Sequence, residues 1–276
     1  NQGHVELDRL QFFVLDEADR MLDMGFLPDL KRIVKQLPAK RQSLFFSATM
    51  PPEAVELADE LLHKPVRIDV TPDNPGTSTS DLVDQKVMHV EFQKKISLLS
   101  NILIRRPVGR VLVFTRTKHG ADRVAKDLKK RDIPTEAIHG DKSQNARTRI
   151  LKDFRKGTTL VLIATDLAAR GIDVDGISHV INYDMPNDCD GYVHRIGRTG
   201  RAGQAGVALT FCTAEDIDQL RAIEQHIQRK IEVDSEHPYH VPGLEELTES
   251  PPSKFRAKEK GSQKDRSRPQ SGGPHS

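Results

Sequence analysis

Short apolar runs alternate with segments of helical periodicity in the first quarter of the chain. Residues 12–15 (Phe-Phe-Val-Leu) form a continuous apolar run of the buried-strand type, and a second buried strand is predicted over 43–46. Apolar positions recur at helical spacing over 30–37, behind a proline, and again over 55–62. A third strand is predicted over 66–70. This block therefore reads as strand, helix, strand, helix, strand.

The alternation restarts after a segment rich in Pro, Gly, Thr and Ser, at 71–80. The predicted strands cover 87–92, 110–114, a short stretch near 137, 160–164, 179–182 and 207–211. The predicted helices cover 96–102, 120–130, 143–156 and 217–227. Strands that alternate with helices in this way are typical of a mostly parallel sheet covered on both faces.

The pattern therefore predicts an α/β protein with two domains. We place the first domain at 1–70, a linker at 71–84, the second domain at 85–234 and a disordered basic tail at 235–276. The second domain looks complete. The first looks incomplete, because two or three strands and two helices make a poor stand-alone parallel sheet.

Composition narrows the class of protein. The chain has 276 residues, of which 36% are apolar, so a substantial core is possible. Its longest apolar stretches are about five residues, against the roughly 20 that cross a bilayer. Its only cysteines, Cys189 and Cys212, form no C-x-x-C pair, which excludes a disulfide scaffold and fits a reducing compartment. We therefore expect a cytoplasmic protein.

Charge is dense and unevenly distributed. The formal net charge is +2, yet residues 250–276 carry seven Lys or Arg against two acidic residues. With a single aromatic, Phe255, this tail cannot bury enough surface to fold alone. It is either a solvated linker or a non-specific electrostatic tether to RNA or DNA.

Two adjacent carboxylates follow the first predicted strand. Asp16 and Glu17 lie where open α/β sheets bind their ligands, at the carboxyl end of a strand. One carboxylate there can hold Mg²⁺ through water and a second can orient an attacking water toward a phosphate. The pair alone fits an acidic helix N-terminus better.

The surrounding strings extend this signal over most of the chain. They are Asp-Glu-Ala-Asp at 16–19, Ser-Ala-Thr at 47–49, Val-Phe-Thr-Arg-Thr-Lys at 113–118, His-Gly-Asp at 139–141 followed by Gln144 and Arg147, Ala-Thr-Asp-Leu-Ala-Ala-Arg-Gly-Ile-Asp at 164–173, and His-Arg-Ile-Gly-Arg-Thr-Gly-Arg at 194–201. These motifs occur in the expected order and at the expected places among the predicted strands and helices. Over about residues 7–230 the chain therefore resembles the DEAD-box RNA helicases of superfamily 2, and its motif sequences are most similar to those of the bacterial RhlE subgroup.

The resemblance implies tandem RecA-like domains, with motifs II and III in the first and motifs IV to VI in the second. It also implies ATP and Mg²⁺ as cofactors, and RNA, gripped through its backbone without sequence preference, as the partner. Ribosomal or RNA-decay proteins are further possible partners; no membrane partner is implied. The activity implied is RNA duplex unwinding coupled to ATP hydrolysis.

The resemblance also implies a role for each residue that matches a position of the family's motifs. The resemblance implies catalysis by Asp16, Glu17, Arg198 and Arg201, with the two carboxylates also holding Mg²⁺ largely through water. It implies ATP binding by Asp173, Arg198 and Arg201, and interdomain coupling by Asp19, Ser47, Thr49, Arg170 and His194. It implies RNA binding by Arg116, Gln144, Arg147, Thr165 and Asp166.

Several of these residues also fit a structural role without any ligand. Arg195, Arg198 and Arg201 recur every three residues beside slim glycines, so they either converge on one anionic group or form a solvated basic loop. Thr165 also suits a helix N-cap, which is compatible with phosphate binding. Gln144 also suits a surface helix.

One expected element is absent from the sequence. Nucleoside triphosphatases of this class use a G-x-x-x-x-G-K-[ST] loop to cradle phosphates, and these 276 residues contain no Gly-Lys dipeptide. Only 15 residues precede the Asp-Glu-Ala-Asp string. We therefore expect an N-terminally truncated piece of a helicase. The alternative to an active helicase is that this chain alone is a non-hydrolysing RNA-binding fragment.

Overall fold

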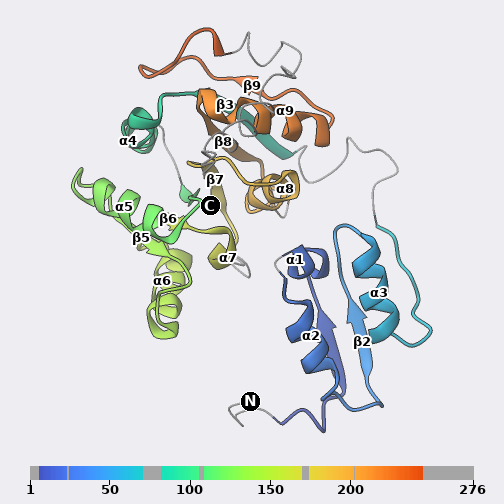
Figure 1. Ribbon diagram of the computed structural model, residues 1–276. Helices are drawn as coiled ribbons and strands as arrows, with labels where there is room; N and C mark the ends of the chain where they lie inside the picture. The colour runs from blue at the N-terminus through green and yellow to red at the C-terminus, as the bar shows by residue number, and fades with distance from the viewer. Residues whose placement is uncertain are drawn as a thin grey trace, which may run out of the picture. The chain divides into compact units, whose positions relative to one another are not determined.

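The computed structural model describes residues 6–23, 25–70, 82–105, 109–169, 174–201 and 203–244. The chain divides into two compact units, Asn1–Thr71 and Pro72–Ser276, which we describe separately (Figure 1). Most of the predicted linker, the tail beyond 244, and the candidate residues Arg170 and Asp173 lie outside the described residues.

The first unit contains a parallel strand pair covered by helices. Strand β1 (Phe12–Leu15) pairs with β2 (Gln42–Phe45) from Phe12↔Gln42 to Leu15↔Phe45. The helices are α1 (Ala18–Asp23), α2 (Leu27–Val34) and α3 (Pro52–Leu61). The buried core consists of Leu15, Ala18, Leu30, Leu57 and Leu61. An ion pair with a distance of 2.8 Å between Lys31 Nζ and Glu60 Oε1 joins α2 to α3 at the surface.

The strand predicted over 66–70 does not form. Val66, Ile68 and Val70 are 86%, 78% and 85% exposed. Their β-branched character favours a strand, but among the described residues no strand lies beside them to supply backbone partners. Among the described residues, no helix combines the length and apolarity that a membrane span needs.

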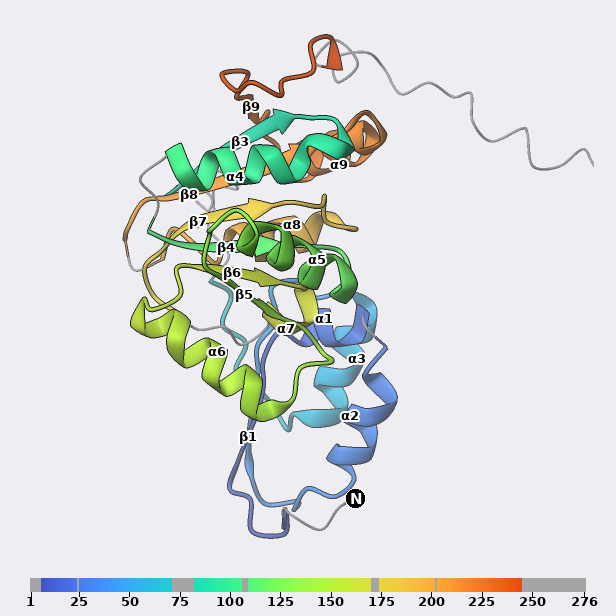
Figure 2. The same cartoon turned by 90° about the vertical axis from the view of Figure 1, so that its left-hand side faces the viewer.

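The second unit is built on a seven-stranded parallel sheet, in the order β5-β6-β4-β7-β8-β3-β9. Its strands are β3 (Val83–His89), β4 (Arg110–Phe114), β5 (Thr135–Ile138), β6 (Val161–Ala164), β7 (Ile177–Asn182), β8 (Gly206–Cys212) and β9 (Glu232–Val233). Figure 2 shows these strands stacked one above the other. All described pairings in this sheet are parallel, so the carboxyl ends of the strands share one edge.

Helices cover both faces of this sheet. They are α4 (Lys95–Arg105), α5 (Lys118–Lys129), α6 (Gln144–Lys156), α7 (Asp166–Ala169), α8 (Cys189–Ile196) and α9 (Ile217–His226), with single 3-10 turns at Phe92–Lys94 and Ala214–Asp216. Alternate residues of β4 point to opposite faces: Val111 and Val113 pack with α4 and α5, whereas Leu112 and Phe114 pack with α6. The predicted α/β class is confirmed.

Local signals set where these helices begin and end. The hydroxyl of Thr117 accepts a bond from the Gly120 N–H and caps α5, and Ser143 caps α6 in the same way. Helix α6 ends at Gly157, whose φ of +74° suits a residue without a side chain. The helices therefore start directly after the strand ends that carry the candidate residues.

The second unit extends beyond its predicted limits. Strand β3 begins at Val83, inside the predicted linker, and residues 235–244 pack on the unit although the sequence assigned them to the tail. Val90 and His240 form an antiparallel bridge, and the His240 ring stacks on His89 with centroids 6.2 Å apart. Leu244 is only 8% exposed. The composition here is polar, so no apolar run marked this segment.

Candidate functional site

The carboxyl end of β1 presents the two adjacent carboxylates. Asp16 is exposed and Glu17 half-buried. Glu17 has a φ of +52°, a left-handed conformation that costs energy in a residue with a side chain. The turn is held by bonds from the Glu17 N–H to Asp16 Oδ1 (2.9 Å) and from the Met21 N–H to Glu17 O (3.0 Å). Carboxylate oxygens are the ligands that Mg²⁺ prefers, so this donor set fits the ion.

The strand ends of the first unit are tied together by Asp19. This side chain is 5% exposed, and its Oδ2 accepts bonds from both the N–H (2.7 Å) and the hydroxyl (2.8 Å) of Thr49. Ser47 Oγ accepts from the Asp19 N–H (3.1 Å) and donates to Thr49 O (2.6 Å). The Asp-Glu-Ala-Asp and Ser-Ala-Thr strings therefore form one hydrogen-bonded unit.

In the second unit, a buried arginine joins two of the sequence strings. Arg195 is 1% exposed; its Nε and Nη2 meet Asp166 Oδ1 and Oδ2 at 2.6 and 2.8 Å. Its Nη1 donates to Asp184 O at 2.7 Å and to Asn182 Oδ1 at 3.3 Å. Its guanidinium also lies over the ring of Phe114, 5.0 Å from the centroid. This two-pronged geometry is the strong form of an arginine–carboxylate pair.

Neither of the two readings of the three arginines fits Arg195, which is buried, turns toward the sheet and pairs with Asp166. It belongs to the last turn of α8, whereas Gly197 ends that helix and leaves Arg198 and Arg201 in the following loop. Both loop arginines are half-buried, and Arg201 Nε donates to Gly197 O at 2.8 Å. Spacing by three residues does not keep side chains together across a helix end.

The remaining candidates lie at the carboxyl edge of the sheet. Arg116 follows β4 and is exposed; Gln144 is the exposed first residue of α6, and Arg147 is half-buried in its first turn. Thr165 lies between β6 and α7, and its carbonyl accepts bonds from the Ala168 and Ala169 N–H groups (3.0 and 2.9 Å), as a helix start requires. His194 is half-buried on α8.

The loop that leads to Gln144 is anchored to α5. Asp122 bonds His139 Nε2 (3.0 Å) and Lys142 Nζ (2.9 Å). Partial burial pushes the pKa of Asp122 upward, but the bonds from Lys142 and His139 outweigh it and hold that pKa below its usual value. A bond from Lys118 holds the pKa of Asp141 low as well.

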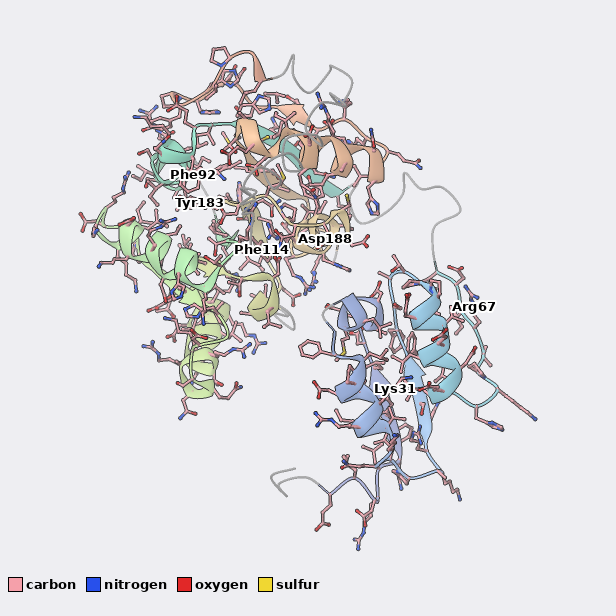
Figure 3. All side chains as sticks on the ribbon, in the orientation of Figure 1. Lys31, Arg67, Phe92, Phe114, Tyr183 and Asp188 are labelled. Atoms are coloured by element: carbon pink, nitrogen blue, oxygen red, sulfur yellow. The ribbon has the colours of Figure 1, made fainter. Side chains whose placement is uncertain are left out.

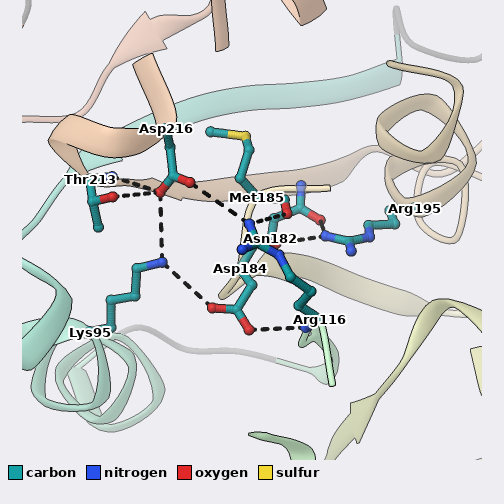
Figure 4. Close-up of polar contacts among 8 residues, drawn as sticks. All are labelled: Lys95, Arg116, Asn182, Asp184, Met185, Arg195, Thr213 and Asp216. Atoms are coloured by element: carbon teal, nitrogen blue, oxygen red, sulfur yellow. Dashed lines mark hydrogen bonds and ion pairs between the residues drawn. The ribbon is translucent and has the colours of Figure 1, made fainter. Parts of the chain in front are cut away.

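Sequence reasoning missed a group of charged residues at the same edge. Lys95, Asp184 and Asp216 lie within one set of polar contacts that includes Arg116 and Arg195 (Figure 4). The only signal for them was that Asp184 follows a strand end, as Asp16 does. Lys95 was inconspicuous because a lysine at a helix start is expected to be solvated.

Comparisons with known proteins agree with these strings. Residues 1–58 match the family of DEAD/DEAH box helicases, and residues 94–203 match the helicase conserved C-terminal domain. The chain is 43% identical over 232 residues to the DEAD-box ATP-dependent RNA helicase CshA of Geobacillus kaustophilus, covering 84% of this chain and 49% of the relative. It is 45% identical over 232 residues to the ATP-dependent RNA helicase RhlB of Pseudomonas putida, covering 83% and 58%. The chain thus spans about half the length of the curated relatives it matches.

Solved structures of DEAD-box proteins are also similar to this chain. Saccharomyces cerevisiae Dbp5 bound to RNA and ADP BeF3 is 31% identical with a TM-score of 0.75, over 83% of this chain and 61% of that one. The Escherichia coli DEAD-box protein SrmB, bound to regulator of ribonuclease activity A, is 35% identical with a TM-score of 0.52, over 55% of this chain and 90% of that one.

Proposed function

Because the chain belongs to the DEAD-box RNA helicase family, we propose that the protein is an ATP-dependent RNA helicase that couples ATP hydrolysis to unwinding of RNA duplexes. Residues 1–70 supply motifs II and III of the first RecA-like domain, and residues 85–234 supply motifs IV to VI of the second. The assignment to the RhlE subgroup stays a prediction, since the bacterial relatives named above are CshA and RhlB proteins.

In the first unit we assign nucleotide chemistry to the end of β1. Glu17 orients the attacking water, and Asp16 holds Mg²⁺ largely through water, with Glu17 beside it. The ion, when bound, neutralises negative charge on the phosphates. The left-handed turn at Glu17 supports this proposal, because strained backbone concentrates at functional positions. Asp19, Ser47 and Thr49 transmit the state of that turn to the end of β2.

In the second unit we assign RNA binding to Arg116, Gln144, Arg147 and Thr165, and nucleotide contact to Asp173, Arg198 and Arg201. Arg170 and His194 complete the coupling between domains. Asp166 is poorly suited to an RNA contact, because both of its carboxylate oxygens already bond Arg195 and a carboxylate repels phosphate. We assign Asp166 to coupling.

The single observation that carries the proposal is the Asp166–Arg195 pair. It links the string at 164–173, which ends a strand and begins a helix, to the string at 194–201, which ends in the loop arginines. A helicase needs such a physical connection between its RNA-contacting and nucleotide-contacting segments, because each ligand must change the affinity for the other.

RNA-stimulated ATP hydrolysis tests the proposal. We expect the protein at its full natural length to hydrolyse ATP faster when single-stranded RNA is added, and to displace a strand from a short duplex. Glu17→Gln keeps the size of the side chain but removes the charge that orients water, so turnover should fall by about 10² or more while RNA binding persists. RNA binding without any turnover by the full-length wild-type protein refutes the proposal. The alternative, that this chain alone is a non-hydrolysing RNA-binding fragment, is not favoured by the names of the relatives.

Partners and location belong to the same proposal. RNA is the substrate, contacted through phosphates and 2′-hydroxyls. We place the protein in the cytoplasm, with ribosomal or RNA-decay proteins as candidate partners.

A further inference from the structure

A charged network centres on Asp184, which lies outside the helicase strings, just after β7 in the middle of the sheet (Figure 4). Each of its four polar groups has a different partner. The Asp184 N–H donates to Phe114 O (3.2 Å), its carbonyl accepts from Arg195 Nη1 (2.7 Å), Oδ2 accepts from the Arg116 N–H (3.0 Å), and Oδ1 pairs with Lys95 Nζ (3.6 Å). One residue thus contacts the loop after β4, the helix α8 and the helix α4.

Lys95 fixes the orientation of the Asp184 carboxylate. Lys95 is 3% exposed, so its ammonium cannot reach water and needs carboxylate partners. Besides Asp184 it has Asp216, whose Oδ2 lies 3.9 Å away. The rings of Phe92 and Tyr183, both labelled in Figure 3, each lie with their centroid 5.8 Å from Lys95 Nζ. Because Lys95 engages Oδ1, Oδ2 is left facing the Arg116 loop.

The Arg116 backbone is fixed, whereas its side chain is only loosely held. The side chain is 53% exposed, with Nη2 3.5 Å from Met185 O and 4.0 Å from Asp216 Oδ1. Contacts of that length are weak, so an incoming phosphate can replace them at little cost. The guanidinium is therefore preorganised near one place but remains available to an anion.

We propose that Asp184 is a positioning residue for RNA binding: it holds the Arg116 loop in the orientation that meets an RNA phosphate, and it ties that loop to helix α8. The inference rests on the proposed function for the identity of the ligand. It adds residues that none of the helicase strings contains, since Asp184 acts through Arg116 and Lys95 acts through Asp184.

RNA binding by the full-length protein tests the proposal directly. The probe is a fluorescently labelled single-stranded RNA, measured by anisotropy. We expect Asp184→Ala and Arg116→Ala each to weaken binding about tenfold, the size of one charge-assisted contact. The double variant should bind no more weakly than Arg116→Ala, because without that side chain the orientation of the loop no longer matters. Asp218→Ala, which removes a carboxylate that is 89% exposed on α9, is the matched control and should leave binding unchanged.

Two further measurements distinguish a role of Asp184 in positioning Arg116 from a role only in the stability of the protein. In RNA-stimulated ATP hydrolysis, Asp184→Ala should raise the KM for RNA more than it lowers kcat. Lys95→Met combined with Asp184→Asn keeps an acceptor oxygen for the Arg116 N–H without leaving a buried charge unpaired, and should restore binding to within about threefold of wild type.

Losses that add up in the double variant, or a Lys95→Met/Asp184→Asn protein that melts like wild type yet binds RNA as weakly as Asp184→Ala, would overturn the inference. Binding that is unchanged in Asp184→Ala overturns it as well. Failure of the helicase proposal looks different: wild-type protein that binds RNA without turnover refutes that activity, while the anisotropy cycle still decides the role of Asp184.

Discussion

Arg195→Ala is the substitution that most directly tests the interactions at the carboxyl edge of the second sheet. The change removes a guanidinium that is 1% exposed and makes four polar contacts, two of them to Asp166. The matched changes are Asp166→Ala and the double variant. Together they form a thermodynamic cycle that isolates the energy of the pair.

The contacts of Arg195 and Asp166 set how much unfolding free energy each variant should lose. Two charge-assisted hydrogen bonds contribute about 1.5–3 kcal/mol each, and breaking a buried ion pair costs about 3–5 kcal/mol. The Asp166 side chain is 31% exposed and regains water when its partner is lost, which keeps the cost of Arg195→Ala near 4 kcal/mol. Asp166→Ala leaves a buried guanidinium with only neutral acceptors and should cost about 3 kcal/mol. The double variant should lose only about 4 kcal/mol.

Urea unfolding measured by tyrosine fluorescence reports these free energies. The chain has no tryptophan, and its three tyrosines, Tyr183, Tyr192 and Tyr239, all belong to the second unit. Tyr192 lies on α8 itself and is fully buried, so its emission should follow the loss of the packing around Arg195. Linear extrapolation to water gives the free energy of each variant.

Two results would refute this reasoning. One is a loss below about 1 kcal/mol for Arg195→Ala, the size typical of an exposed pair. The other is a double variant that loses the sum of the single losses, which would mean that the two side chains do not act on each other. A coupling energy of about 3 kcal/mol is the expected outcome.

Three further predictions concern other parts of the chain. Asp19→Ala should destabilise the first unit by about 2–3 kcal/mol and Thr49→Val by about 1 kcal/mol. The double variant should be no less stable than Asp19→Ala alone, because Asp19 accepts both Thr49 bonds; hydrogen exchange at residues 12–23 and 42–49 measures these losses. Asp122→Asn should lower the free energy of unfolding at pH 6. A pKa lowered by folding contributes its full stability above the unfolded pKa of about 3.9 and loses it as the pH falls through the folded pKa, so the difference from wild type should be smaller at pH 3 than at pH 6; parallel urea titrations at the two pH values check it. Gly157→Ala should cost about 1 kcal/mol although nothing lies within 4 Å of an added Cβ, because the φ of +74° is strained for alanine, and Gly140→Ala, also in open space but without a positive φ, is the control in thermal unfolding.

Apolar periodicity predicted the second unit well, because its strands are buried on both faces and its helices on one. The runs at 110–114 and 160–164 and the helix at 143–156 correspond to elements within a residue or two at each end. The prediction failed at 66–70, where the same β-branched pattern occurs without a neighbouring strand to supply hydrogen bonds. It also failed at 235–244, where histidine stacking and a single backbone bridge hold a polar segment. The local sequence pattern shows which secondary structure a segment favours, but a strand forms only where a neighbouring strand supplies hydrogen-bond partners.

Within the candidate site, the motif strings named residues but did not predict what each side chain contacts. Arg195 and Arg198 are indistinguishable as letters in one string, yet one lies before the end of α8 and faces the sheet while the other lies after it in a loop. Lys95 and Asp184 belong to no string because neither has a neighbour in sequence that reveals its partner; the connection forms only when α4 packs beside the end of β7. A buried lysine requires a carboxylate, and a carboxylate fixed in this way can in turn orient a backbone N–H. The residues that hold the Arg116 loop are therefore set by the fold of the sheet, and a search for them in relatives should follow the strand ends rather than the motifs.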